Sequence, residues 1–208
     1  ARATELEVQT AASANPLTGL PGNIAIQRWI QDALRNPPAS IVYGDLDRFK
    51  EYNDTYGFTC GDEMIRLAAR LLERFLLLPS ANARLGHIGG DDFIVVCDGA
   101  VPEIVLEEVC SAFDEEKRHL FSPEHVRQDG YPSVTRQGQT MMVPLATLSL
   151  AVITTDNLGV DPHPGVFSQM AASLKKKVKA QNAERQRSGY LMERRQAGGD
   201  MLSLHLSL

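Results

Sequence analysis

The sequence predicts a single α+β domain in which helices flank a mostly antiparallel sheet of five strands. Short apolar runs rich in β-branched residues alternate with longer stretches that repeat apolar residues at helical spacing, in the approximate order α-β-α-β-β-α-β-α-β. Two of the short runs are joined through Gly-Gly, which is typical of an antiparallel hairpin. The composition, 43% hydrophobic and 23% charged over 208 residues, is that of a globular protein.

The first predicted elements of the domain are a helix and a buried strand. Residues 22–34 carry apolar side chains at helical spacing, and Pro37-Pro38 stops the helix. Residues 40–46 form an apolar run that ends in acidic residues, which indicates a buried strand. Upstream, residues 1–14 are expected to be a helical linker from a preceding module, which Asn15-Pro16 breaks.

A turn, a helix and a hairpin are expected next. Residues 57–61 are predicted to form the turn, and the helix after it has an apolar face at i, i+4, i+7, i+8 and i+11. Residues 85–88 and 93–97 resemble short strands on either side of a Gly-Gly-Asp-Asp turn, because tight hairpin turns need positive φ. The apolar face of the helix consists of Met64, Ala68, Leu71, Leu72 and Phe75.

The C-terminal half is predicted to hold two more helices and two more strands. The helices are expected at 102–120 and 166–181, the second with a basic end, and the strands at 145–153 and 189–192, the last at the sheet edge. Between them, the polar and turn-rich residues 121–142 are expected to be a surface excursion. The domain then spans residues 15–192, and residues 193–208 form a disordered or tag-derived tail.

Charge and composition exclude several classes of protein. The longest near-apolar run, residues 141–153, is too short to cross a bilayer, and we expect no membrane contact from this segment. No secretory signal is visible, and three cysteines without a CxxC pair argue against a zinc ribbon or disulfide framework, which favours the reducing cytoplasm. Residues 175–195 hold eight Lys or Arg against two acids. This segment is either a solvated helix face or a receptor for an anion such as a nucleotide phosphate.

Two acidic clusters carry the chemical signal. One follows the buried strand and includes Asp45 and Asp47; the other is Gly89-Gly90-Asp91-Asp92. Carboxylates at a strand end and an adjacent hairpin tip can converge on Mg²⁺, which takes its remaining ligands from water and substrate phosphate. The alternatives are an exposed loop start for the first cluster and a simple turn for the second. An EF-hand and a P-loop do not fit the sequence, because the required glycine, glutamate and GxxxxGK[ST] spacings are missing.

Three motifs in a fixed order resemble one family. They are Leu17-Thr18-Gly19-Leu20-Pro21-Gly22-Asn23, then Asp45-Leu46-Asp47-x-Phe49-Lys50-x-x-Asn53-Asp54-x-x-Gly57-x-x-x-Gly61-Asp62, then Gly89-Gly90-Asp91-Asp92-Phe93. Together with Leu148-Ser149-Leu150-Ala151 and a lysine after a helix, they resemble the GGDEF domain of diguanylate cyclases, with a variant GGDDF signature. The resemblance extends from about residue 15 to about residue 192.

The resemblance implies a fold, a reaction and partners. The fold would be the cyclase-like palm, with its central sheet flanked by helices. The reaction would condense two GTP into cyclic di-GMP with release of pyrophosphate, in bacterial second-messenger signalling. Each domain would bind one GTP together with Mg²⁺ (or Mn²⁺), and two domains would face each other as a homodimer. A sensory or regulatory domain would precede this one, and no nucleic-acid polymer would be bound.

The resemblance also implies residue roles. Asp45, the Leu46 carbonyl and Asp91 would ligate the metal ion, Asp91 would help to activate the 3′-hydroxyl, and Lys179 would reach the phosphates. The backbone near Arg48 and Phe49, with Lys50, would lie near the β- and γ-phosphates, and Gly89 and Gly90 would let backbone approach a phosphate. Asn53 and Asp62 would bind the guanine edge, although Asp62 could instead complement the start of its helix. The implied catalytic set is Asp45, Asp91, Asp92 and Lys179.

The chain departs from the family pattern at several positions. Asp92 replaces the usual Glu, Ala183 stands where an Arg is common, and Arg185 or Arg187 is a candidate substitute. Residues 80–83 are Ser-Ala-Asn-Ala, so the RxxD inhibitory site is absent. His87 stands where an Arg is common and is expected to be structural. These departures leave two functions open: an active cyclase, or a degenerate domain that binds GTP or cyclic di-GMP and regulates a partner without turnover. A scaffold without nucleotide is disfavoured by the retained polar set.

Overall fold

The computed structural model describes residues 13–79, 82–134, 138–158 and 164–193. The expected linker, residues 1–14, lies outside these ranges except for residues 13 and 14. The expected tail, residues 193–208, lies outside them except for residue 193.

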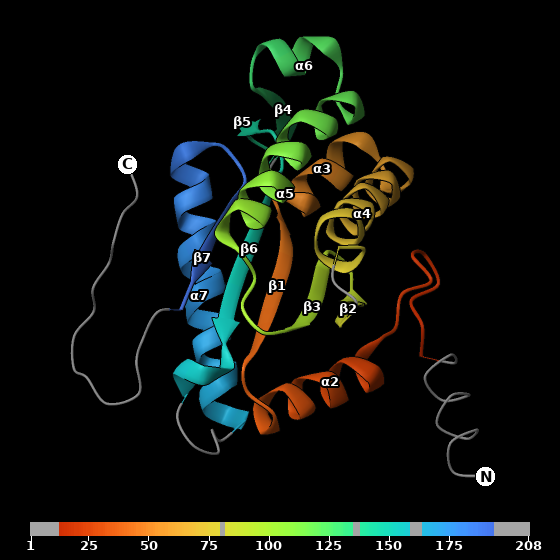
Figure 1. The fold of residues 1–208 in the computed structure, drawn as a ribbon. Coiled ribbons are helices and arrows are strands. Elements are labelled where there is room, and N and C mark those ends of the chain that lie inside the picture. Colours follow the sequence, from red (N-terminus) through yellow and green to blue (C-terminus); the bar gives the residue numbers. More distant parts are fainter. Residues whose placement is uncertain (1–12, 80–81, 135–137, 159–163, 194–208) are drawn as a thin grey trace.

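A five-stranded sheet forms the centre of the domain (Figure 1). Its strand order is β2-β3-β1-β6-β7, and only the last pair, β6 with β7, is parallel. The mostly antiparallel α+β fold predicted from the sequence is therefore confirmed, and so is the edge position of the last strand. The strands are β1 (Ala39–Asp47), β2 (Ala83–Gly89), β3 (Asp92–Asp98), β6 (Thr147–Thr154) and β7 (Gly189–Met192).

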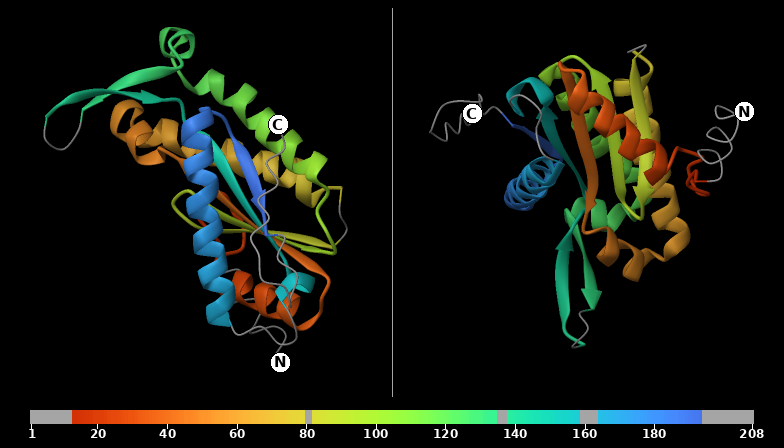
Figure 2. Two further views of the ribbon diagram at one scale, coloured as in Figure 1. Left: turned by 90° about the vertical axis from the view of Figure 1, so that its left-hand side faces the viewer. Right: turned by 90° about the horizontal axis from the view of Figure 1, so that it is seen from below.

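Helices cover both faces of this sheet (Figures 1 and 2). Helices α2 (Asn23–Arg35) and α7 (Pro164–Arg185) pack on one face, and α4 (Phe58–Leu72) and α5 (Glu103–Glu116) pack on the other. Side chains alternate along the central strand β1, because successive residues of a strand point to opposite faces. Ile41 therefore belongs to the apolar cluster with α2 and α7. By the same alternation, the acidic residues at the end of β1 face α7.

The region after β1 differs from the prediction. A helix, α3 (Phe49–Tyr56), follows the strand directly, and α4 begins at Phe58, so the turn predicted at 57–61 is wrong. Gly57, with a φ of 84°, makes the short break between the two helices. Gly61 lies inside α4, and its missing Cβ leaves room for the Asn53 side chain: a Cβ at Gly61 would lie 1.8 Å from Asn53 Oδ1. After α4 the chain continues as a π-helical turn, η1 (Glu73–Leu77).

The predicted excursion at 121–142 contains regular structure. After α5 and the 3₁₀ turn η2 (Lys117–Leu120), this segment forms a one-turn helix, α6 (Pro123–Arg127), and a hairpin of β4 (Gly130–Val134) with β5 (Thr140–Pro144). The hairpin extends away from the body of the molecule (Figure 2). Its base is fixed because Tyr131 is fully buried among aromatic rings, which the polar composition of the segment did not predict. The neighbouring rings are Tyr56, Phe121 and His125.

Asp47 joins three elements at the end of β1. Its Oδ2 accepts hydrogen bonds from Thr147 Oγ1 and Ser149 Oγ of β6, both at 2.7 Å, and from Asn182 Nδ2 of α7 at 3.2 Å. Asn182 Nδ2 also lies 3.1 Å from the Leu148 carbonyl oxygen. All of these polar groups are buried, so the expectation that Asp47 begins an exposed loop is wrong. The network fixes α7 against the ends of β1 and β6.

Removal of the Asn182 amide should therefore destabilise the domain. We expect Asn182→Ala to lower the free energy of unfolding by about 1–3 kcal/mol, because it leaves the buried Asp47 carboxylate without one of its donors. Urea unfolding followed by circular dichroism measures the loss. Glu184→Ala, an exposed position in the same helix, is the control and should change stability by less than about 0.5 kcal/mol. Equal losses in the two variants would contradict this account of the network.

Candidate functional site

Asp45 is the centre of the candidate site. It lies on β1 two residues before Asp47, and its side chain is only 8% exposed. Lys175 Nζ of α7 lies 3.0 Å from Asp45 Oδ2, and the Lys179 ammonium contacts Asp45 Oδ1. Burial raises the pKa of the Asp45 carboxyl, and the two lysines oppose that rise. The strand end thus holds a buried carboxylate between two ammonium groups.

The hairpin between β2 and β3 brings the second acidic cluster to Asp45. In the sheet register Asp92 pairs directly with Asp45, and Lys175 Nζ also lies 2.5 Å from Asp92 Oδ1. Gly89 and Gly90 have φ angles of 146° and 59°, which glycine adopts readily, so the predicted tight hairpin is confirmed. A Cβ on either glycine would meet nothing within 4 Å, which leaves open space beside the turn.

Asp91 lies at the tip of this hairpin, where the charge of Asp45 repels its carboxylate. Two effects raise the pKa of the Asp91 carboxyl to about 6: burial is the larger, and repulsion from Asp45 is the smaller. The two carboxylates repel each other, and a divalent cation bound between them would reduce that repulsion. They are therefore suitable ligands for such an ion. Asp45 Oδ1 is also buried, and the Lys179 ammonium is in ionic contact with it.

The residues at this strand end fit a magnesium site. Asp45 and Asp91 supply two carboxylates, and Leu46 follows Asp45 with its side chain buried in the opposite core. Among the described residues, no group of three or more His, Cys, Asp or Glu forms a closed metal site. A site with two carboxylates suits Mg²⁺, which keeps several waters and takes further ligands from substrate phosphates.

Helix α3, the residue before it and the first two turns of α4 hold the residues expected to bind the nucleotide. Arg48 has a left-handed φ of 59°, and its Nη1 is buried without a hydrogen-bond partner in the described structure. Asn53 Oδ1 is likewise buried and unpartnered, beside Gly61 and therefore next to Asp62 in the chain. Asp62 occupies the second turn of α4, too far along the helix to complement its first turn. Lys50 is exposed and pairs with Asp54 at 2.6 Å.

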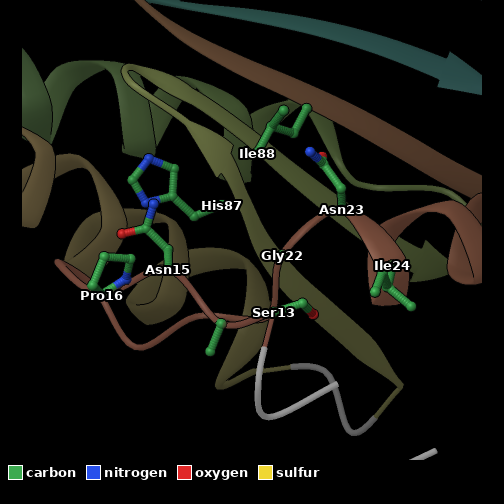
Figure 3. Close-up of a pocket in the computed structure, with 9 residues that line it drawn as sticks. Ser13, Asn15, Pro16, Gly22, Asn23, Ile24, His87 and Ile88 are labelled. Carbon is green, nitrogen blue, oxygen red and sulfur yellow. The ribbon is translucent and has the colours of Figure 1, made fainter. Parts of the chain in front are cut away.

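The His87 side chain packs against the β2–β3 hairpin and fixes its turn. Its ring is 1% exposed, stacks on Phe93 at 4.5 Å, and has Nε2 3.0 Å from the Gly90 carbonyl oxygen. Nε2 must donate there, so Nδ1 accepts from the Thr18 hydroxyl at 3.0 Å. Burial lowers the pKa of His87, in keeping with the neutral ring. A pocket beside it is lined by Asn15 and other residues of the 13–24 segment (Figure 3), and it is separate from the carboxylates.

The two candidate substitutes for the Arg expected at position 183 lie at the end of α7 and just after it. Ala183 and Arg185 are exposed at the end of α7. Arg187 lies near α5 on the far side of the sheet, where its charge partly offsets the burial that raises the pKa of Cys110. Residues 80 and 81 of the segment where RxxD is absent lie outside the described residues.

Two contributors to the site were not predicted from the sequence. Lys175 bridges Asp45 and Asp92, and Asn182 holds Asp47. A signal for Lys175 was present, since it precedes Lys179 by four residues and such pairs share one face of a helix. Asn182 gave no comparable signal, because an asparagine near the end of a helix is common.

The fold and these motifs agree with comparisons to known proteins. The family described as "Diguanylate cyclase, GGDEF domain" matches residues 12–130, more than half of the chain. The chain therefore belongs to the GGDEF family, whose members here include proteins of cyclic di-GMP signalling. Among the described residues no helix is long and apolar enough to span a membrane.

Individual relatives are bacterial and longer than this chain. The diguanylate cyclase DgcN of Escherichia coli is 30% identical over 119 residues, which is 55% of this chain and 28% of DgcN. An uncharacterized signaling protein of Caulobacter vibrioides is 36% identical over 113 residues, which is 51% of this chain and 14% of that protein. The chain thus spans less than a third of the length of these relatives.

Solved structures share the fold. The coiled coil and GGDEF domain of DgcB from Caulobacter crescentus, in complex with cyclic di-GMP, superposes with a TM-score of 0.59 at 19% identity and covers 91% of each chain. Diguanylate cyclase SiaD of Pseudomonas aeruginosa, in complex with its activator SiaC, has a TM-score of 0.62 at 21% identity and covers 92% of this chain and 66% of SiaD.

The raised pKa of Asp91 predicts a pH dependence of stability in metal-free solution. The folded protein holds the Asp91 proton to about pH 6, whereas the unfolded chain loses it near pH 4, so this group's contribution falls as pH rises through that window. Asp91→Asn abolishes the fall. Relative to the wild type, the variant should gain about 1 kcal/mol in free energy of unfolding between roughly pH 4 and pH 7, a figure reduced for partial exposure.

Chemical unfolding in the presence of a chelator, at several pH values, measures this difference. Glu108→Gln removes an exposed carboxylate on α5 and should keep a nearly constant difference from the wild type. A constant difference for Asp91→Asn as well would contradict the environment described for Asp91.

Proposed function

We propose that this domain binds GTP with Mg²⁺ (or Mn²⁺) and, as a homodimer, condenses two GTP into cyclic di-GMP with release of pyrophosphate. The observation that carries the proposal is the meeting of Asp45, Asp91 and two α7 lysines at one strand end, beside the open Gly-Gly turn. Carboxylates, ammonium groups and accessible backbone are the groups that a metal-bound triphosphate requires.

The α3–α4 junction supports guanine as the base. Asn53 Oδ1 is a buried acceptor without a partner, and such a group is costly unless a ligand donates to it. Guanine offers donors at N1 and the 2-amino group, which Asp62 and Asn53 can accept. Adenine does not present this pair of donors, so it would leave the two acceptors unpaired.

The phosphates would lie between α3 and the hairpin. Arg48 Nη1 is a buried donor without a hydrogen-bond partner among the described residues, and the exposed Lys50 follows two residues later in the chain. Lys179, which contacts Asp45 in the protein alone, is close enough to the strand end to share its charge with a phosphate. Bound Mg²⁺ would be held by Asp45, Asp91 and the Leu46 carbonyl, and would supply charge neutralisation on the phosphates and alignment of the reacting oxygens.

Catalysis would need two copies of the domain. The 3′-oxygen of one GTP attacks the α-phosphorus of the other, the bond to the β-phosphate breaks, and pyrophosphate leaves. The proton of the 3′-hydroxyl passes to a base, for which Asp91 is placed at the hairpin tip. A second bond of the same kind closes the ring. Activity should therefore rise more steeply than linearly with protein concentration.

A second function is favoured by specific observations. Ala183 removes a basic side chain, and Asp92 is held by Lys175. These features suit a domain that binds GTP or cyclic di-GMP and regulates a partner or an attached module without turnover. Because SiaD is seen with an activator and DgcB with a coiled coil, we propose an upstream regulatory segment for this chain in either case. The free cysteines suit a cytoplasmic setting.

The first test is detection of cyclic di-GMP by mass spectrometry after concentrated protein is incubated with GTP and Mg²⁺. We expect product, and we expect Asp91→Ala to reduce its rate of formation by roughly 100-fold or more, because a metal carboxylate is lost. Asp98→Ala, at the other end of β3, is the matched control and should retain activity. A folded wild type that binds GTP and yields no product would instead support the regulatory function.

The second test concerns base specificity. Asp62→Ala should weaken GTP binding by roughly 10- to 100-fold, because one hydrogen bond to a charged acceptor is lost, while weak ATP binding stays unchanged. Calorimetric titration with each nucleotide and Mg²⁺ gives both affinities. Glu63→Ala, the exposed neighbour in α4, should bind GTP like the wild type. An equal loss for GTP and ATP in Asp62→Ala would argue against base recognition by this residue.

A further inference from the structure

Lys175 occupies an unusual position for a side chain near a metal site. Its ammonium lies 3.0 Å from Asp45 Oδ2 and 2.5 Å from Asp92 Oδ1, so it bridges the first acidic cluster and the second. The lysine side chain is 26% exposed, and the Asp45 side chain is 8% exposed. The Lys175–Asp45 ion pair is therefore partly shielded from solvent, and its electrostatic attraction is stronger than that of an ion pair on the surface.

The two oxygens of Asp45 are both occupied by ammonium groups. Lys175 contacts Oδ2, and Lys179, one helical turn further along α7, contacts Oδ1. A divalent cation must approach a carboxylate oxygen to about 2.1 Å, inside the position of either ammonium. An ion on Asp45 would therefore lie close to the Lys175 ammonium of the arrangement seen, and the two like charges would repel each other.

We propose that Lys175 is an internal counter-cation that competes with the divalent metal ion for Asp45, while Asp92 holds it beside that carboxylate. In the metal-free domain its single charge offsets part of the charge of the two carboxylates, and an ion that binds Asp45 would displace it. This inference rests on the proposed function, because it concerns the same metal site, and it names the residue that sets the site's metal affinity.

The competition has two measurable consequences. Removal of the Lys175 charge should strengthen metal binding, since the ion no longer displaces an ammonium group. It should also destabilise the metal-free protein, because the buried Asp45 then lacks one counter-charge. A lysine with a purely structural role would give the second effect without the first, so metal affinity separates the two roles.

The experiment measures Mn²⁺ binding to the full chain without nucleotide, by the electron paramagnetic resonance signal of free Mn²⁺. Lys175→Met should lower the Mn²⁺ dissociation constant by about tenfold or more relative to the wild type. Lys175→Gln is a second neutral variant in case the first does not fold, and it should show the same direction. Lys175→Arg keeps the charge and should keep the weak affinity of the wild type. Lys177→Met, an exposed lysine on the same helix, should also resemble the wild type.

Thermal unfolding gives an independent readout. Lys175→Met should melt below the wild type in a chelator, and excess Mg²⁺ should raise its melting temperature by more than it raises that of the wild type. The inference is overturned if the neutral variants bind Mn²⁺ no more tightly than the wild type while both still bind GTP. If neither the wild type nor the variants bind Mn²⁺ or GTP, the proposed function fails, and the inference fails with it.

Discussion

The burial of two carboxylates at the end of β1 is the constraint on which the rest of the structure depends. Asp45 and Asp47 lie on the same face of the central strand, and an isolated buried charge is far too costly to leave uncompensated. Helix α7 supplies the compensation, with Lys175 and Lys179 for the first carboxylate and Asn182 for the second. The packing of α7 against the sheet thus also supplies the charges and hydrogen bonds that the two buried carboxylates require.

Local patterns in the sequence were enough for much of the fold. The apolar run of β1, the Gly-Gly hairpin and the apolar face of α4 each depend on neighbours within a few residues, so they could be predicted. The start of α4 was not predicted, because Gly61 looks like a turn residue, whereas it lies in the helix and its missing Cβ leaves room for the distant Asn53 side chain. Helix α3 was missed although Phe49, Tyr52 and Tyr56 are spaced for one face of a helix.

In the candidate site, too, some residues could be predicted from the sequence and others could not. Asp45 and Asp91 could be named from motifs, because chain topology brings a strand end and an adjacent hairpin tip together. Lys175 could not be assigned, since its role depends on how α7 is rotated against β1, which is a tertiary relationship. Burial of Tyr131 likewise depends on rings from α3 and from the segment after α5, distant in sequence.

The charge balance of the site links metal to nucleotide. The carboxyl groups of Asp45, Asp47, Asp91 and Asp92 outnumber the two ammonium groups of α7 by two, which is a formal excess of negative charge. A triphosphate alone would add to that excess and be repelled. One divalent cation would cancel it, so under the proposed function the phosphates would be attracted only if the metal ion arrived before them or with them. An ammonium released from Asp45 would then face the incoming phosphate. The same positive charge would thus stabilise Asp45 in the metal-free site and the phosphate in the nucleotide-bound site.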